Sequence, residues 1–347
     1  MRVAAKADNP LERAALAAGQ VPEPLFEAYV ALMMARSIIA GTELGLFDAL
    51  AETPDDAAGL ARRLELDAPG VDVLLLALHA QGYLDVDGAR YRPSSRTRRT
   101  LLPGGRQSTR AWMHFSTDMW DAFTELEAKV RGDAPQDIHD KPADDPYWER
   151  YMRGLFELSK LTRGDVARAI GAPAPRRLLD IAGGHAGFAM ALCDRHAGLH
   201  ATVADLEGAA RIGRAIVEEE GYADRIAFRV GDVFEGDLDG PYDLATAFSI
   251  VHHFSPERNV ALLRRARSAL RVGGRMAVFE LERPAGEDRG TQLGTLTGVL
   301  FYLTSGGRTY TGEEIAGFFT EAGFVDVRVK QLLRAPGNLL VTGDNPG

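Results

Sequence analysis

Short apolar strands alternate with helices through the second half of the chain, and this alternation limits the possible folds more than any other feature. Strand patterns are expected at 177–181, 201–204, 226–230, 244–249 and 275–281. Helical patterns fill the gaps, for example at 187–196, 209–220 and 256–271. Strands separated by helices pair in parallel, which predicts a doubly wound, Rossmann-like α/β sheet. The last segment, 325–342, turns at Ala335-Pro336-Gly337 and predicts a C-terminal antiparallel hairpin.

The first part of the chain has a mostly helical pattern. Segment 24–40 is apolar almost all round, which is typical of a buried helix or of a helix at a subunit interface. Shorter helical patterns follow at 44–50, 55–64 and 70–82. Segment 83–91 alternates around Asp87-Gly88, as a β-hairpin does. Helix, turn, helix and hairpin in this order predict a winged helix.

The length of 347 residues corresponds to about two domains. Residues 131–146 are rich in Asp, Pro and Gly, which favours a linker or a mobile cover, and a helical pattern follows at 147–170. We therefore expect a winged-helix dimerisation domain at 1–110, a helical linker and substrate lid at 111–170, and an α/β domain at 171–347.

Charge and composition argue against nucleic acid and membranes as partners. The formal net charge is −9 at pH 7, and helix 70–82 has no Lys, Arg, Asn or Ser to bind base edges. Residues 1–10 lack the apolar core of a secretory signal, and the uncharged run 290–307 is too polar for a membrane span. Cys193, the single cysteine, excludes an intrachain disulfide and fits a reducing cytoplasm.

A glycine-rich loop joins the first strand of the α/β pattern to its helix. The strand ends at Asp180 and runs into Ile181-Ala182-Gly183-Gly184-His185-Ala186-Gly187. Glycines let the backbone approach a ligand, and a helix N-terminus offers free N–H groups, so this arrangement is typical of nucleotide binding. A dinucleotide is disfavoured, because Ala182 replaces the first glycine of the G-x-G-x-x-G pattern.

Two further acids follow the next two strands. Asp205 ends the second strand, where a carboxylate can accept hydrogen bonds from both ribose hydroxyls. Asp232 follows the third strand and precedes Val233 and Phe234. A carboxylate there can accept from an adenine amino group, while the apolar side chains hold the ring. Three such features after three successive strands predict a site for a nucleoside-containing cofactor.

The motifs LLDIAGGHAG, ADLEGA, GDVFEG, SIVHHFSPERN and GGRMAVFELERP resemble those of the small-molecule O-methyltransferases that carry an N-terminal winged-helix dimerisation domain. The resemblance runs from about Val21 to the end of the chain. It implies S-adenosylmethionine as the cofactor, with S-adenosylhomocysteine as the product, and a homodimer formed by the N-terminal helices. The implied cofactor-binding residues are Asp180, Ala182, Gly183, Gly184, Asp205, Leu206, Asp232, Val233, Phe234 and Ser249.

The glycine loop departs from the family pattern at two positions. The family's D-V-G-G-G-x-G appears here with Ala182 and Ala186 in the place of glycines. Where such a position requires a positive φ, alanine costs roughly 1 kcal/mol or more.

The family places its general base just after the fourth strand, in a V-L-H-D-W-type segment. Here that position is His252, and His253 replaces the usual acid. Glu280, in a V-x-E-x-x-x-P context, would orient the imidazole as the acid of a catalytic triad does. A second flanking acid is expected where Thr309 stands, so this chain lacks it. A metal held by His252, His253 and Glu280 is the alternative, although sequence neighbours rarely face one centre.

An apolar, aromatic-lined pocket suits a flat aromatic or polyketide acceptor. Its candidate residues are Met113, Trp148, Met152, His253, Leu300 and Thr304. We expect O-methylation of a small secondary metabolite in the cytoplasm. The alternatives are methylation of carbon or nitrogen, a relative that catalyses hydroxylation, decarboxylation or cyclisation, and a winged-helix regulator that senses a small molecule.

Overall fold

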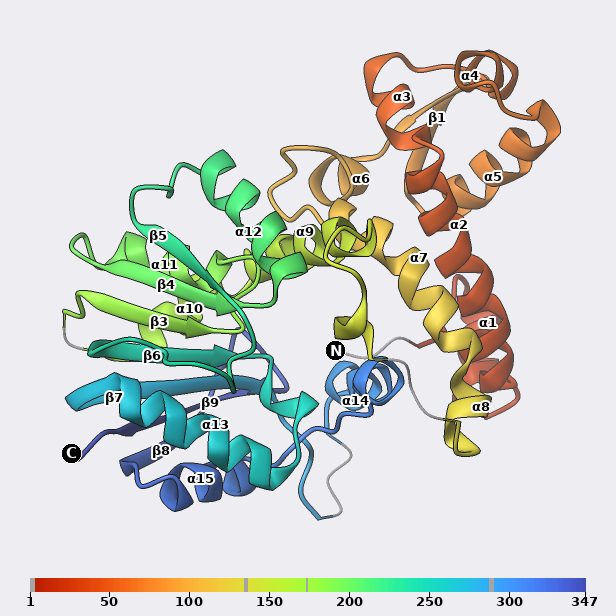
Figure 1. Cartoon of the computed structure of the whole chain (residues 1–347). Helices are drawn as coiled ribbons and strands as arrows, with labels where there is room; N and C mark the ends of the chain where they lie inside the picture. The colour runs from red at the N-terminus through yellow and green to blue at the C-terminus, as the bar shows by residue number, and fades with distance from the viewer. Residues whose placement is uncertain (1–3, 134–136, 173, 287–289) are drawn as a thin grey trace. The chain divides into compact units, whose positions relative to one another are not determined.

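The structure is a computed structural model that describes residues 4–133, 137–172, 174–286 and 290–347 (Figure 1). It consists of two compact units, Met1–Thr117 and Asp118–Gly347, here called the N-terminal unit and the C-terminal unit. The boundary between them falls inside helix α7 (Arg110–Thr124) and so within the segment expected as a linker and lid.

The N-terminal unit contains the predicted winged helix. Its helices are α1 (Pro10–Ala17), η1 (Leu25–Val30), α2 (Ala31–Glu43), α3 (Leu46–Glu52), α4 (Ala57–Leu64), α5 (Ala68–Ala80) and α6 (Ser95–Thr100). Asp56 and Asp67 cap α4 and α5 by accepting hydrogen bonds from backbone N–H groups at 2.7 and 2.8 Å. Strand β1 (Leu84–Asp87) pairs antiparallel with β2 (Arg90–Pro93). Helix, turn, helix and hairpin follow in the predicted order.

The apolar segment expected as one helix at 24–40 forms two consecutive helices, a π-helix (η1) and then α2. Helix α2 ends before Gly45, whose φ of 69° is in the left-handed region that glycine adopts readily. Ile39 is buried, but Leu32 and Met33 are 52% and 44% exposed, so much of the apolar surface lacks cover within the chain. Leu25–Glu43 is also long and apolar enough to cross a membrane, a weak indication because soluble core helices and signal sequences pass the same test.

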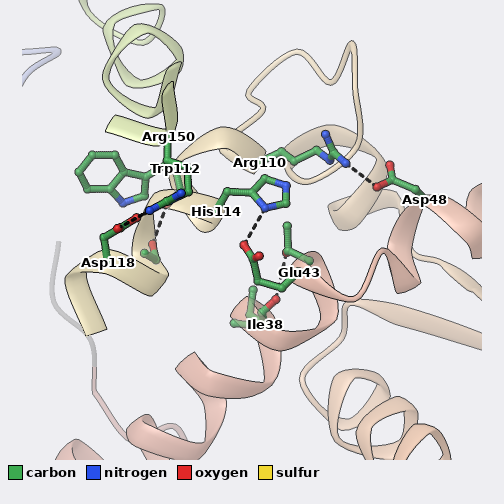
Figure 2. A network of polar contacts seen from close by, with 10 residues as sticks. Ile38, Glu43, Asp48, Arg110, Trp112, His114, Asp118 and Arg150 are labelled. Atoms are coloured by element: carbon green, nitrogen blue, oxygen red, sulfur yellow. Dashed lines mark hydrogen bonds and ion pairs between the residues drawn. The ribbon is translucent and has the colours of Figure 1, made fainter. Parts of the chain in front are cut away.

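Two polar contacts connect the start of α7 to earlier helices of the N-terminal unit (Figure 2). His114 Nδ1 lies 2.7 Å from the carboxylate of Glu43 at the end of α2, and Arg110 lies 2.7 Å from the carboxylate of Asp48 on α3. Such partly exposed pairs contribute about 0–1 kcal/mol each, so they orient α7 more than they stabilise it.

The C-terminal unit is built around a seven-stranded sheet in the order β5-β4-β3-β6-β7-β9-β8. The strands are β3 (Arg177–Ile181), β4 (His200–Asp205), β5 (Ile226–Val230), β6 (Tyr242–Phe248), β7 (Leu270–Leu281), β8 (Val325–Gln331) and β9 (Asn338–Asp344). Strands β3 to β7 pair in parallel, and β9 is antiparallel to β7 and β8. This confirms the predicted doubly wound sheet with a C-terminal hairpin.

Helices α11, α12, α13 and α15 of the C-terminal unit pack on its sheet (Figure 1). All the helices described in this unit after α7 are α8 (Leu126–Val130), η2 (Ile138–Asp140), α9 (Tyr147–Ser159), α10 (Arg163–Ala169), α11 (Gly187–Arg195), α12 (Glu207–Glu219), η3 (Val251–His253), α13 (Pro256–Ala269), α14 (Gln292–Ser305) and α15 (Gly312–Glu321). Helices α11 and α12 contact β4, whereas α13 contacts β7 and α15 contacts β8 and β9. After β3 the chain adds β4 and β5 on one side of β3, and it then returns to add β6 and β7 on the other side. Ligands of such sheets bind at the carboxyl ends of the strands beside this switch point.

Candidate active site

In the glycine loop after β3, both positions where alanine replaces a glycine of the family pattern have positive φ angles. Ala182 and Ala186 have φ values of 52° and 58°, and Gly184 has 40°. Both alanines therefore occupy the left-handed region, where a side chain costs roughly 1–2 kcal/mol. Gly183 is restricted for another reason, because a Cβ there would lie 2.4 Å from Asp180 Oδ2. The two alanines and Gly184 thus share the left-handed conformation that glycine adopts most easily.

Asp205, at the end of β4, is tied to this loop. Its Oδ2 accepts a hydrogen bond from the backbone N–H of Gly184, and its Oδ1 accepts one from Leu206, both at 2.7 Å. Burial raises the pKa of Asp205, although the two hydrogen bonds and nearby His139 oppose that shift. Each carboxylate oxygen has a second lone pair, so Asp205 can still accept from two ligand hydroxyls.

Asp180, at the end of β3, is 2% exposed and accepts a hydrogen bond from Thr246 Oγ1 at 2.6 Å. Burial and the nearby Asp205 raise the pKa of Asp180 to about 7, against the effect of the Thr246 hydrogen bond. Two acids thus lie close together under the glycine loop. A cationic group bound there would favour the ionised form of Asp180.

The remaining candidates for cofactor binding follow β5 and β6. Asp232 is exposed, and its Oδ1 accepts from the backbone N–H of Phe234 at 2.8 Å, which fixes the turn. Val233 is buried, while the half-buried Phe234 ring contacts Phe254 edge-on at 5.0 Å between centroids. Ser249 is exposed just after β6, with a φ of 52°.

These side chains fit the cofactor implied by the sequence. Asp180 and Asp205 lie in the last two residues of β3 and β4, and Asp232 and Ser249 come just after β5 and β6, so all four lie at the carboxyl ends of adjacent parallel strands. The loop after β3 has no room for a side chain at Gly184, where a Cβ would come within 2.9 Å of Met152 Sδ. The carboxylates can accept hydrogen bonds from hydroxyl and amino groups, and a ligand can approach the backbone of the glycine loop closely. Both features suit the nucleoside and the cationic end of S-adenosylmethionine.

His252 lies in η3, the turn that follows β6, and is held against the end of β7. Its Nδ1 lies 2.9 Å from Oε1 of Glu280, and the two side chains are 3% and 0% exposed. A carboxylate can only accept, so His252 donates from Nδ1 and keeps Nε2 free for another partner. Glu280 Oε1 also accepts from the backbone N–H of Leu281 at 3.1 Å. Glu280 Oε2 is buried, and among the described residues it has no hydrogen-bond partner.

The turn that carries His252 is fixed by its neighbours. The amide of buried Asn259, on α13, donates to the carbonyls of Val251 and Phe254 at 2.9 and 3.2 Å. The carbonyl of His252 accepts from the backbone N–H of Arg308 at 2.9 Å, and a Cβ on Gly307 would come within 2.3 Å of that oxygen. The absence of a side chain at Gly307 therefore permits a close approach to the turn that carries His252.

The ring of His253 is also held in place. Its Nδ1 lies 2.7 Å from Ser305 Oγ, which donates its own proton to the carbonyl of Phe301 at 3.0 Å. His253 therefore donates from Nδ1. Burial, His252 and His139 lower the pKa of His253 well below its usual value.

Among the described residues, no group of three or more His, Cys, Asp or Glu is arranged to hold a metal ion, which leaves the alternative of a metal site without structural support.

The candidates for the acceptor pocket occupy different places. Met152 contacts the glycine loop, and Trp148 packs against Gly208, where a Cβ would meet its ring at 2.3 Å. Leu300 and Thr304 lie on α14, which contacts both η2 and η3, and the Thr304 hydroxyl donates to the carbonyl of Leu300 at 2.9 Å. Met113 belongs to the N-terminal unit, where it packs against that unit's core.

Three side chains near the base received no role from the sequence. Phe301 stacks on His252, with ring centroids 3.4 Å apart. His139 of η2 contacts His253 edge-on at 4.6 Å between centroids, and its Nδ1 lies 2.6 Å from Asp137. Asn259 fixes the turn, as described. The sequence offers one indication for Phe301, because it lies between the candidate pocket residues Leu300 and Thr304. Its contact with His252, however, depends on the tertiary fold.

Comparisons with known proteins agree with this geometry. The model of the O-methyltransferase domain family matches residues 128–325, more than half of the chain. The chain is 28% identical over 336 residues to 3-hydroxy-5-methyl-1-naphthoate 3-O-methyltransferase of Streptomyces sahachiroi, covering 93% of this chain and 95% of that protein. It is also 28% identical over 295 residues to aclacinomycin 10-hydroxylase RdmB of Streptomyces purpurascens, covering 81% of this chain and 78% of that protein.

A solved structure extends the similarity to a cofactor complex. The structure of PigF with S-adenosylhomocysteine is 27% identical, has a TM-score of 0.79, and covers 97% of this chain and 99% of that one. The curated PigF protein, from a Serratia species, is described as an S-adenosyl-L-methionine-dependent methyltransferase. The chain therefore belongs to the O-methyltransferase domain family and is an S-adenosylmethionine-dependent methyltransferase.

Proposed function

We propose that this enzyme transfers the methyl group of S-adenosylmethionine to a hydroxyl of a small aromatic or polyketide-type secondary metabolite, with His252 as the general base. The observation that carries the proposal is the buried pair of His252 and Glu280, 2.9 Å apart, at the same sheet edge as Asp180 and Asp205. The naphthoate O-methyltransferase, which matches nearly the whole chain, supports the choice of acceptor.

In this proposal the cofactor supplies an activated methyl group, and the protein aligns the acceptor and removes its proton. Asp205 binds the ribose, Asp232 the adenine, and the loop at 182–184 the rest of the cofactor. His252 accepts the acceptor's proton at Nε2, because Glu280 holds the opposite ring nitrogen as a donor. Glu280 also stabilises the imidazolium that results, as the acid of a catalytic triad does.

The acceptor pocket is proposed between the segment before the sheet and α14. Trp148 and Met152 on α9, together with His253, Leu300 and Thr304, form its walls in the C-terminal unit. We further propose that residues 111–170 serve as a linker and substrate lid and that the enzyme acts in the cytoplasm.

We also propose a homodimer formed by the N-terminal helices. Helices η1 and α2 expose a group of large apolar side chains. Each of these is 44% exposed or more: Tyr29, Leu32, Met33 and Met34. Large exposed apolar surfaces are uncommon on monomeric proteins and indicate contact with a partner.

The test is methyl transfer to a panel of phenolic and naphthol-type acceptors, with S-adenosylmethionine labelled in the methyl group. The proposal predicts a labelled aryl methyl ether. Label on carbon or nitrogen would replace the proposal with the corresponding C- or N-methyltransferase. The control is the same panel with S-adenosylhomocysteine added, which should suppress transfer because it occupies the same site.

A hydroxylase is the second candidate. It is favoured by the similarity to the 10-hydroxylase RdmB and by Thr309, which stands where the family has an acid beside its base. A product that gains oxygen without a labelled methyl group would select this candidate. Retention of both His252 and Glu280 favours methyl transfer to oxygen.

A further inference from the structure

The imidazole of His252 lies flat against an aromatic ring that the proposed mechanism does not use. The centroids of the His252 and Phe301 rings are 3.4 Å apart, and the ring planes differ by 4°. Phe301 lies near the end of α14, where its carbonyl accepts from the backbone N–H of Gly307 at 3.2 Å and from Ser305 Oγ at 3.0 Å. Because Ser305 also binds His253, the ring of Phe301 and the catalytic turn are fixed to each other.

This superposed arrangement discriminates between the two protonation states of His252. Neutral aromatic rings avoid direct face-to-face contact, because both faces are electron-rich, and they prefer offset or edge-to-face packing. An imidazolium carries a positive charge, which the face of a phenyl ring attracts by about 0.5–2 kcal/mol. The stack therefore favours the charged ring, which is the form that His252 takes after it accepts a proton.

The groups around His252 leave Phe301 a distinct role. Glu280 faces the imidazole from β7, and His253 faces it from the same turn, with ring centroids 4.1 Å apart. His139 of η2 packs edge-on against His253, with ring centroids 4.6 Å apart. Thr309 brings no charge to the place where the family has its second acid.

We propose that Phe301 is a positioning residue that stabilises the imidazolium of His252 by cation–π stacking, and thereby fulfils the function of the missing second acid. This inference rests on the proposed role of His252 as the base. It explains how a site with a single flanking carboxylate supports proton removal from an acceptor of ordinary acidity. It also predicts that the aromatic character of residue 301 matters more than its volume.

The first test needs no acceptor. In the ligand-free protein with isotope-labelled histidines, the ring signals of His252 are followed by NMR as the pH is varied. Phe301→Leu removes the aromatic face but stays apolar, and the midpoint of the His252 titration should fall by about 0.5–1 pH unit. Phe301→Tyr keeps the aromatic face and should retain the wild-type midpoint. Phe123→Leu, at an exposed phenylalanine of α7 in the same unit, is the matched control and should change nothing.

The second test uses a phenolic acceptor that the wild type methylates. For Phe301→Leu, the rise of kcat/KM with pH should move to lower pH, and its plateau should fall about 3- to 10-fold, because a weaker base transfers the proton more slowly. Phe301→Tyr should restore both. An unchanged NMR midpoint and an unmoved pH profile in Phe301→Leu would overturn the inference, even with a reduced rate. Retained activity in His252→Ala would instead overturn the proposed function.

Discussion

His252 donates a hydrogen bond from Nδ1 to Oε1 of Glu280 across 2.9 Å, and both side chains are almost completely buried. A buried carboxylate paired with an imidazole fixes the tautomer of the ring and favours its protonated form. The pair joins the turn after β6 to the end of β7, which are neighbouring parallel strands. The base is therefore positioned by the sheet itself and not by a surface loop.

The ribose acid can be tested by cofactor binding alone. Asp205→Ala should weaken the binding of S-adenosylhomocysteine by about 2–4 kcal/mol, because two hydrogen bonds to a charged acceptor are lost. Isothermal titration calorimetry measures this change directly. Glu207→Ala, an exposed acid two residues further on, is the control and should bind normally. Equal affinities for both variants would remove Asp205 from the cofactor site.

The two left-handed alanines of the glycine loop should limit stability. Replacing Ala182 or Ala186 by glycine relieves backbone strain, and each change should raise the free energy of unfolding by about 0.5–1 kcal/mol. Chemical denaturation measures the gain. Ala261→Gly, inside helix α13, is the control and should lower stability by about 0.5–1 kcal/mol. A loss of stability in both loop variants would show that the alanines are not strained.

The buried Asp180 makes stability depend on pH. Its pKa in the folded protein is raised to about 7, so folding takes up a proton that the unfolded chain releases above about pH 4. The stabilisation is present at low pH and is lost as the pH rises toward 7. Asp180→Asn keeps an acceptor for Thr246 but cannot ionise. Its melting temperature should therefore exceed that of the ligand-free wild type most at pH 8, less at pH 5, and not at all below about pH 4. A difference that stays constant from about pH 4 to pH 8 would contradict this assignment.

The exposed apolar residues of α2 should hold two copies together. Light scattering should give twice the chain mass of 37.6 kDa at micromolar concentration. Leu32→Glu combined with Met33→Glu should shift the mass to the monomer, since two charges would be buried in an apolar contact. Leu333→Glu, at a 99% exposed leucine between β8 and β9, should leave the dimer intact. A monomeric wild type would exclude the dimer.

The parallel sheet was predictable because each strand is a short apolar run between clear turns; the strand at 226–230 was placed to the residue. Helix α14 was not predicted, because its glycines and threonines obscure any helical pattern. Helix α15 carried a readable signal that was not used: Thr311 and Glu314 form a capping box, with bonds of 3.1 and 2.7 Å.

The candidate site was predictable where a motif carries the chemistry and not where the tertiary fold creates the contact. The sequence placed Asp205 and Glu280 at the ends of strands, and the structure puts both at the expected edge of the sheet. The sequence shows that alanine stands at two glycine positions of the family pattern. Only the folded loop shows that both alanines have positive φ values. The stacking of Phe301 on His252 joins positions 49 residues apart (301 − 252), which no local pattern encodes.

The role of His252 as base for an oxygen acceptor is tested most directly by the pH dependence of methyl transfer in His252→Gln. At pH 7 this variant should lose about 10²–10⁴-fold in turnover of a phenolic acceptor while it binds S-adenosylhomocysteine normally. The loss should shrink at high pH, where the phenol ionises without help. Glu280→Gln should lose less, and His200→Gln, at an exposed histidine, should lose nothing. Full activity of His252→Gln at pH 7, with cofactor affinity intact, would contradict the account.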